Sequence, residues 1–208
     1  MAVKLPDQSD DPGLGLLEDP PEVAAEDGYG RLVHGLRGFL DAFAAARPDD
    51  EAIRELTEDL AAWRSRLHGY AVSEREQPYS RRPELPGRGQ ALVPRTVFQI
   101  IDDELSGTVT FGRAYLGGNG AVHGGAVPLL FDELFGKLSN HGDRGFSRTA
   151  ALHVDFRAIT PVGRELDVRL WIESIEGRKR IMRGTLHDGP TLCAEAETLL
   201  LELRPGQP

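Results

Sequence analysis

The chain has 208 residues, 40% of them hydrophobic, which is enough for one domain of ordinary size with an appendage. The formal net charge of −9 argues against nucleic acid or an anionic membrane surface as the main partner. The single cysteine, Cys193, excludes an internal disulfide framework and a cysteine-based zinc cluster. The sequence shows neither a secretion signal nor an apolar run of membrane-spanning length, so we expect a cytoplasmic protein.

The N-terminal part of the chain is expected to form an extension made of three segments. Residues 1–30 are rich in acid and proline, which predicts an extended or disordered leader. Residues 31–70 carry two apolar stripes at helical spacing and predict a helical hairpin, with Asp49 or Asp50 as the N-cap of its second helix. The two stripes are Leu32, Leu36, Leu40 and Phe43, then Ile53, Leu56, Leu60 and Trp63. Residues 71–95 are polar and proline-rich, which predicts a linker.

Residues 96–204 change to a pattern of strands interrupted by one long helix at about 123–140. Apolar and polar residues alternate along several of these strands. The positions expected to face inward are Leu105, Val109 and Phe111, then Leu152, Val154, Phe156 and Ala158, then Leu166, Val168, Leu170 and Ile172. Asp188 and Gly189 mark a hairpin between the last two strands. Since the later strands join by short turns, we predict a mostly antiparallel sheet and an α+β fold.

A glycine-rich stretch, "YLGGNGAVHGG" at residues 115–125, comes directly before the predicted helix. The first backbone N–H groups of a helix have no intrahelical partner and lie at the positive end of its dipole. Glycine there lets a ligand approach the backbone, so the helix start suits an anion or a carbonyl oxygen that becomes an oxyanion. The alternative is that the glycines only permit a tight turn and close packing of helix and sheet.

An acid, Asp132, lies inside the apolar run of the same helix, where an unpaired carboxylate is costly. We expect the neighbouring Glu133 to be the exposed acid of this helix. The eight residues from Gly124 to Asp132 correspond to about 12 Å along a helix axis, so one reacting carbon cannot lie close to both within one chain. Two antiparallel helices related by a two-fold axis would bring these groups together, which makes a dimer part of the predicted mechanism.

The motif "VHGGAVPLLFD", with its acid nine residues after the histidine, resembles the signature of hotdog-fold acyl-CoA thioesterases of the PaaI-like group. "TAALHVDFRAITPVG" resembles the strand that follows the helix in that group. The resemblance covers about residues 95–204. It implies a hotdog fold, a curved antiparallel sheet around one long helix, with the N-terminal helical extension added to it. It also implies a homodimer, or a dimer of dimers, with active sites shared between subunits.

The resemblance also implies roles for individual residues. The Gly124 N–H would polarise the thioester carbonyl, Asp132 would act as general base on water or as nucleophile, and His123 would shape the turn. Many relatives carry an asparagine six residues before the histidine, thought to hold the attacking water. That position is Gly117 here, and the nearby Asn119 is left either as a substrate-binding residue or as a turn residue.

The implied substrate, an acyl-coenzyme A, carries phosphates that require basic residues at the mouth of the site. Arg178, Lys179 and Arg180 form a basic cluster beside a turn and are the expected phosphate ligands, with a solvated hairpin as the alternative. Gly125 is expected to contact substrate beside Gly124. We expect no separate cofactor, and the histidines show no metal-ligand spacing, so we also expect no metal.

Two other functions remain open at this point. One is a non-catalytic hotdog protein that binds acyl-CoA or regulates other proteins, which would not need Asp132. The other is an enoyl-CoA hydratase, for which the usual Asp/His pair is not apparent in the sequence.

Overall fold

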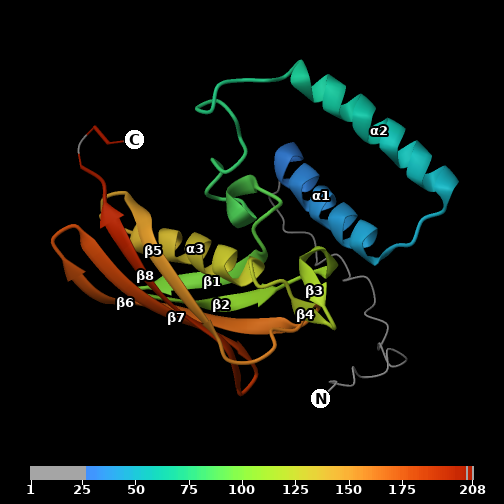
Figure 1. Cartoon of the computed structure of the whole chain (residues 1–208). Coiled ribbons are helices and arrows are strands. Elements are labelled where there is room, and N and C mark those ends of the chain that lie inside the picture. Colours follow the sequence, from blue (N-terminus) through green and yellow to red (C-terminus); the bar gives the residue numbers. More distant parts are fainter. Residues whose placement is uncertain (1–26, 205, 208) are drawn as a thin grey trace.

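The computed structural model describes residues 27–204 and 206–207, so most of the predicted leader lies outside the described residues. Two helices come first, followed by a sheet wrapped around a third (Figure 1). The helices and 3-10 turns are α1 (Gly28–Ala45), α2 (Asp50–His68), η2 (Pro86–Gly89), η3 (Arg113–Tyr115) and α3 (Ala126–Ser139). The strands are β1 (Arg95–Ile101), β2 (Glu104–Thr110), β3 (Leu116–Gly118), β4 (Ala121–Val122), β5 (Ser147–Phe156), β6 (Glu165–Glu176), β7 (Lys179–Asp188) and β8 (Thr191–Glu202).

The main sheet has the strand order β1-β2-β6-β7-β8-β5, and every neighbouring pair is antiparallel. The β7–β8 hairpin turns at Gly189 and Pro190, with Gly189 in the left-handed region at φ 54°. Figure 1 shows the sheet curving around α3, which lies along its concave face. The predicted α+β hotdog architecture, with a helical extension before it, is therefore confirmed.

The apolar face of α3 forms the centre of the core. Leu130, Phe131, Leu134, Phe135 and Leu138 are fully buried against the inward positions of the sheet. The predicted inward residues of β2 and β6 are buried or packed against this core, because alternate side chains of a strand share one face. The prediction was wrong for Phe156, at the end of β5, which is 54% exposed.

The two adjacent acids of α3 have the opposite environments from those predicted. Glu133 is only 7% exposed, whereas Asp132 is exposed. Glu133 accepts two hydrogen bonds from the Arg88 guanidinium, at 3.0 and 2.8 Å, and lies 3.6 Å from the Lys137 ammonium. The reason is that η2 folds over α3 and supplies Arg88, a partner that the helix sequence alone does not reveal.

The N-terminal extension is fixed to the hotdog domain through one face of α1. Arg37 donates to the carbonyl oxygens of Pro86 and Gln90, which belong to the segment before β1. On the same helix, Asp41 accepts a hydrogen bond of 2.9 Å from the Ala114 N–H of η3. The segment predicted as a linker therefore packs between α1 and α3, and Leu85 and Val93 are buried within it.

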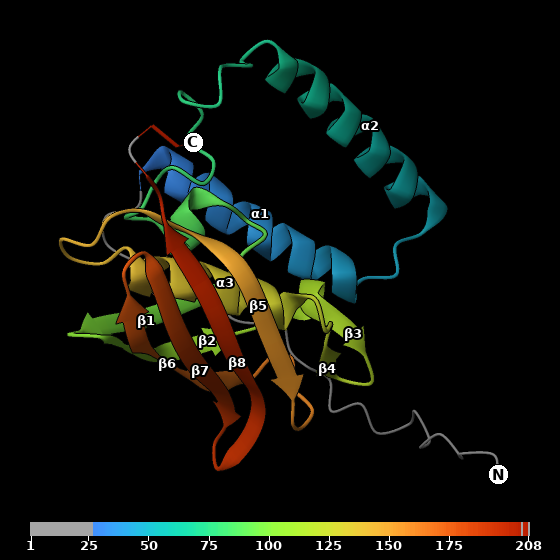
Figure 2. The ribbon, with the colours of Figure 1, turned by 60° about the vertical axis from the view of Figure 1, so that its left-hand side comes forward.

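The structure does not show the predicted packing between the two N-terminal helices. Figures 1 and 2 both show α2 standing apart from α1. Within the described residues α2 has no buried residue, and in α1 only Gly30 and Val33 are buried. The apolar stripes of both helices are largely exposed as a result. Neither these helices nor any other in the described ranges is both long and apolar enough to cross a membrane.

The Arg88–Glu133 pair provides a test of how the extension is anchored. We expect Arg88→Ala to lower the free energy of unfolding by about 2–3 kcal/mol, because the buried Glu133 carboxylate loses two charged hydrogen bonds. Urea unfolding of the full chain measures the change. Arg54→Ala, which breaks an exposed pair with Glu58, is the control and should cost at most about 0.5 kcal/mol. Equal losses in the two variants would contradict a stabilising role for the buried pair.

Candidate functional site

The site begins with a short hairpin, β3–β4, that leads into α3. Gly118 pairs with Ala121, and the two residues between them, Asn119 and Gly120, have φ angles of 50° and 73°. Two consecutive positive φ angles in a two-residue loop define a type I′ turn, for which Asn-Gly is the preferred sequence. Asn119 is therefore a turn residue. This was one of its two expected roles, the other being substrate binding.

Gly117 allows the hairpin to approach the start of the helix closely. A Cβ atom at this position would lie 2.8 Å from the His123 Cα and 3.1 Å from its backbone nitrogen. Because both of these atoms are backbone, relief would require the hairpin to move. The absence of an asparagine at residue 117 thus has a physical reason in this chain.

His123 organises the turn into α3 with three hydrogen bonds. Its N–H donates to the Tyr115 carbonyl at 2.7 Å, and its carbonyl accepts from the Ala126 N–H at 2.9 Å. Its imidazole Nδ1 accepts from the Gly125 N–H at 3.0 Å, which requires Nδ1 to be unprotonated. The Gly125 N–H is therefore already bonded within the chain and is not a donor for substrate.

Gly124 differs from its neighbours because its N–H donates to no acceptor in the part of the chain that the structure describes. The residue is exposed at the entrance to α3. A Cβ atom there would meet nothing closer than the Phe156 ring at 3.9 Å, and the backbone is not in the left-handed region. Neither conformation nor packing requires glycine at this position. The available N–H at the start of α3 instead fits a donor to an incoming carbonyl oxygen.

Tyr115 anchors the β3–β4 hairpin to the segment before β1. Its ring packs edge-on against Phe111, with ring centroids 5.7 Å apart, and its hydroxyl donates to the Leu92 carbonyl at 2.9 Å. Burial raises the pKa of Tyr115 to about 12, so the hydroxyl remains a proton donor. The backbone carbonyl that holds His123 is thereby tied to the segment before β1.

Asp132 projects from the middle of α3 toward β5. Its Oδ1 accepts a hydrogen bond of 2.8 Å from the Thr149 hydroxyl. Nothing in the sequence spacing links these two residues, so Thr149 was not predicted. Within one chain Asp132 lies about 9 Å along the axis of α3 from Ala126, and Gly124 precedes the first residue of the helix. The structure of a single chain therefore does not bring the two predicted groups together.

The basic cluster is divided by the structure. Arg180 is only 2% exposed, and its guanidinium donates to the Ser139 and Gly145 carbonyls and to the Glu202 carboxylate. It ties the end of α3 to the sheet, so the structure does not support its expected role as a phosphate ligand. Arg178 and Lys179 are exposed on the β6–β7 turn, although Arg178 also donates to the Glu202 carbonyl.

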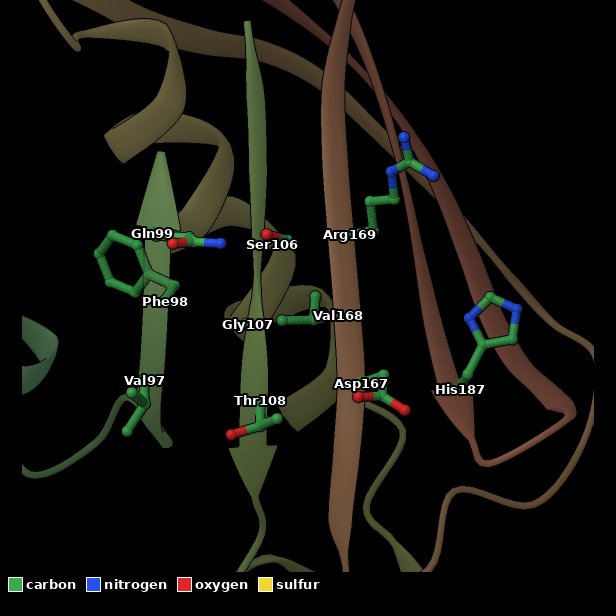
Figure 3. A pocket seen from close by; sticks show the side chains of 10 residues that line it. All are labelled: Val97, Phe98, Gln99, Ser106, Gly107, Thr108, Asp167, Val168, Arg169 and His187. Atoms are coloured by element: carbon green, nitrogen blue, oxygen red, sulfur yellow. The ribbon is translucent and has the colours of Figure 1, made fainter. Parts of the chain in front are cut away.

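A shallow hollow lies elsewhere, on the face of the sheet turned away from α3 (Figure 3). Its lining includes Thr108, Asp167, Arg169 and His187, from β2, β6 and β7. None of the predicted site residues lines it. The described residues also contain no group of three or more histidine, cysteine or acidic side chains that could hold a metal ion.

Comparison with known proteins supports the assignment of this domain. The model of the thioesterase superfamily matches residues 119–194, a segment that contains both Gly124 and Asp132. The acyl-coenzyme A thioesterase THEM4 of Rattus norvegicus is 32% identical over 91 residues, which is 43% of this chain and 39% of that relative. The chain thus matches only about two fifths of that relative's length. The hotdog domain described above is thus similar to thioesterase-superfamily domains over residues 119–194.

A solved structure of a thioesterase superfamily protein aligns with a TM-score of 0.72 at 25% identity. The alignment covers 84% of this chain and 95% of that protein. Since the hotdog domain is little more than half of the chain, the alignment extends into the N-terminal helices. The similarity to that structure therefore includes part of the N-terminal extension.

The close contact at Gly117 gives a second prediction. We expect Gly117→Ala to lower the free energy of unfolding by about 1–3 kcal/mol, because the added methyl group forces the hairpin away from His123. Thermal or urea unfolding measures the change. Gly35→Ala is the matched control, since its Cβ atom would enter open space on α1. A Gly117→Ala protein as stable as the control would show that the hairpin and His123 are not closely packed.

Proposed function

We propose that the protein hydrolyses the thioester bond of an acyl-coenzyme A, as an enzyme of the PaaI-like group. The observation that carries this proposal is the thioesterase-superfamily match over residues 119–194, which contains the unbonded Gly124 N–H and the Asp132 carboxylate. The similarity to an acyl-coenzyme A thioesterase supports the substrate class.

The proposed reaction uses one group from the turn before α3 and one from the middle of this helix. The Gly124 N–H donates to the thioester oxygen, and Asp132, as general base, takes a proton from the water that attacks the carbonyl carbon. The resulting oxyanion collapses, the carbon–sulfur bond breaks, and the coenzyme A thiolate takes up a proton as the free acid leaves. In the alternative course the Asp132 carboxylate attacks the carbonyl carbon, and the carbon–sulfur bond breaks to give a mixed anhydride and the coenzyme A thiolate, which takes up a proton. Water then hydrolyses the anhydride to the free acid and restores the Asp132 carboxylate.

We further propose that two subunits share each site, because in one chain Gly124 precedes α3 and Asp132 lies about 9 Å along the helix axis from its first residue, Ala126. Support comes from β5, the last strand of the main sheet, which bonds only to β8 among the described strands. A ten-residue unpaired strand edge is a template for pairing with another chain. Pairing of β5 with its copy about a two-fold axis would place the two α3 helices side by side and antiparallel.

The same arrangement would explain the position of the remaining basic residues. Arg178 and Lys179 lie near the C-terminal end of α3, where Arg180 bonds to Ser139, and so are remote from Gly124 of their own chain. Antiparallel helices would bring this end of one subunit toward the helix start of the other. We therefore propose Arg178 and Lys179 as contacts for the coenzyme A phosphates of the neighbouring site.

The catalytic role of Asp132 is tested by substitution. We expect Asp132→Asn to lower kcat for hydrolysis of acyl-CoA by a factor of about 100 or more, because the amide cannot accept the proton of water. A panel of acyl-CoAs of different chain length, assayed for release of the free thiol, measures the effect. Asp143→Asn, which changes an exposed acid outside the helix, is the control and should retain full activity.

Two outcomes would contradict parts of this proposal. Full activity of Asp132→Asn would remove this residue as the base or nucleophile. If neither the wild type nor the variant hydrolyses any thioester while acyl-CoA still binds, the protein is instead a non-catalytic acyl-CoA-binding hotdog protein.

The shared site predicts that activity depends on association. We expect sedimentation velocity to show at least a dimer at the concentrations where the protein is active. Specific activity should fall when dilution dissociates that species, because each half-site lacks either the N–H donor or the acid. A monomer with full specific activity would overturn the shared site and leave the thioesterase assignment standing.

A further inference from the structure

The apolar stripe of α2 has no part in the candidate site described above. Ile53, Leu60, Trp63 and Leu67 are between 48% and 59% exposed, and Leu56 lies in the same line. The Arg66 guanidinium covers the Trp63 ring at 4.1 Å but leaves the other members of the stripe uncovered. Four apolar side chains of α2 are therefore exposed, and Leu56 is partly covered.

A helix of this kind normally requires a packing partner. The helix has good local signals, since the Asp49 side chain caps its start and basic residues occupy its last turn. In proteins most of the stability of a helix comes from burial of its apolar face. The exposed stripe is thus the face through which α2 would be stabilised.

The spacing of the stripe indicates what kind of partner fits it. The steps from Ile53 to Leu56, Leu60, Trp63 and Leu67 are three, four, three and four residues. This is the a/d pattern of a coiled coil, in which the seam faces another helix with the same pattern. The pattern favours a helix as partner over a flat surface.

The charges on α2 indicate that the partner helix is a second copy in the opposite direction. Its first half carries Asp50, Glu51, Glu55, Glu58 and Asp59 against one basic residue. The charged residues of its second half, Arg64 and Arg66, are both basic, and His68 is its last residue. Antiparallel pairing of two copies can bring Glu58 and Asp59, at the end of the acidic half, against the basic half of the other helix, whereas parallel pairing places like charges together.

The charges beside the seam agree with this direction. Asp59 and Arg66 occupy equivalent positions one heptad apart on the same side of the stripe. In an antiparallel pair, this side of one helix faces the same side of its copy. Asp59 then lies beside Arg66 of the partner subunit. The two-fold axis repeats this contact between Arg66 and the partner subunit's Asp59.

The neighbouring helix of the same chain is a poorer partner. An antiparallel hairpin of α1 and α2 would bring Arg31 and His34 of α1 to the end of α2 that carries Arg64 and Arg66. The same hairpin would place Asp41 beside the acidic half of α2, although that carboxylate is already bonded to the Ala114 N–H. Like charges at both ends oppose this pairing, in agreement with the separation of the two helices in Figure 2.

We propose that α2 is an association helix, which pairs through its apolar stripe with α2 of a second copy of this chain in an antiparallel two-fold contact. The contact is independent of β5 and of the thioesterase chemistry. It therefore adds a second link between subunits on the N-terminal extension.

The experiment measures distances between two copies of α2 in the full chain by pulsed electron paramagnetic resonance. Spin labels are attached to Ser65→Cys in one sample and to Glu51→Cys in another, both on the outer face of α2; the native Cys193 is buried. With the Asp59–Arg66 register and a rise of 1.5 Å per residue, two labels at residue 65 are offset by about 8 Å along the axes. Two labels at residue 51 are offset by about 35 Å. We expect a clearly longer distance at residue 51.

Variants then establish that the stripe and the flanking charges cause these distances. Leu60→Glu should abolish them, whereas Ala62→Glu, which places the same charge on the opposite side of α2, should preserve them. Asp59→Arg should weaken the pairing, and Asp59→Arg combined with Arg66→Asp should restore it. Circular dichroism and acyl-CoA hydrolysis of each variant verify that the hotdog domain remains folded.

Three results would overturn the proposal. The first is the lack of a defined distance between labels at residue 65 in the wild-type background. The second is a distance that persists in Leu60→Glu, which would mean that the stripe is not the contact. The third is equal distances at the two labelled positions, which would indicate parallel copies.

Discussion

The rotation of α3 about its own axis is the constraint on which the candidate site depends. The apolar stripe of this helix is buried in the curve of the sheet, and Leu134 and Leu138 are fully inaccessible. With the stripe fixed, each remaining residue of the helix has a determined direction, about 100° from the next. Asp132 is thereby directed to the edge strand β5, and Glu133 to the segment before β1. The same burial fixes the start of α3 and the direction of the Gly124 N–H.

The turn into α3 contains glycines that the fold requires and one, Gly124, that it does not require. Gly117 is required by packing, since its Cβ atom would strike the His123 backbone, and Gly120 is required by its positive φ angle. Gly124 is required by neither, and its N–H is unbonded among the described residues. The imidazole of His123 takes the N–H of Gly125 and leaves that of Gly124. One donor is thereby selected from a glycine-rich stretch that offers several.

Sequence patterns were sufficient for the architecture and insufficient for the partners of polar residues. Strand alternation predicted the buried positions of β2 and β6, and the motif around His123 located the start of α3 within three residues. The reversal of Asp132 and Glu133 could not be read from the helix, because Arg88 reaches Glu133 from 45 residues away. Arg180 was misplaced for the same reason, since its acceptors at Ser139 and Gly145 are brought to it only by the fold. Local periodicity reports which face is buried, and long-range pairing decides which charge is tolerated there.

The N-terminal extension is structurally continuous with the site. The Asp41 carboxylate of α1 bonds to the Ala114 N–H, and a Cβ atom at Gly112 would lie 2.2 Å from that carboxylate. Ala114 is followed by Tyr115, whose carbonyl accepts the His123 N–H. A displacement of α1 would therefore disturb the contact that holds the turn before Gly124. The contact of α1 with η3 therefore acts on the candidate site through the geometry of the β3–β4 hairpin.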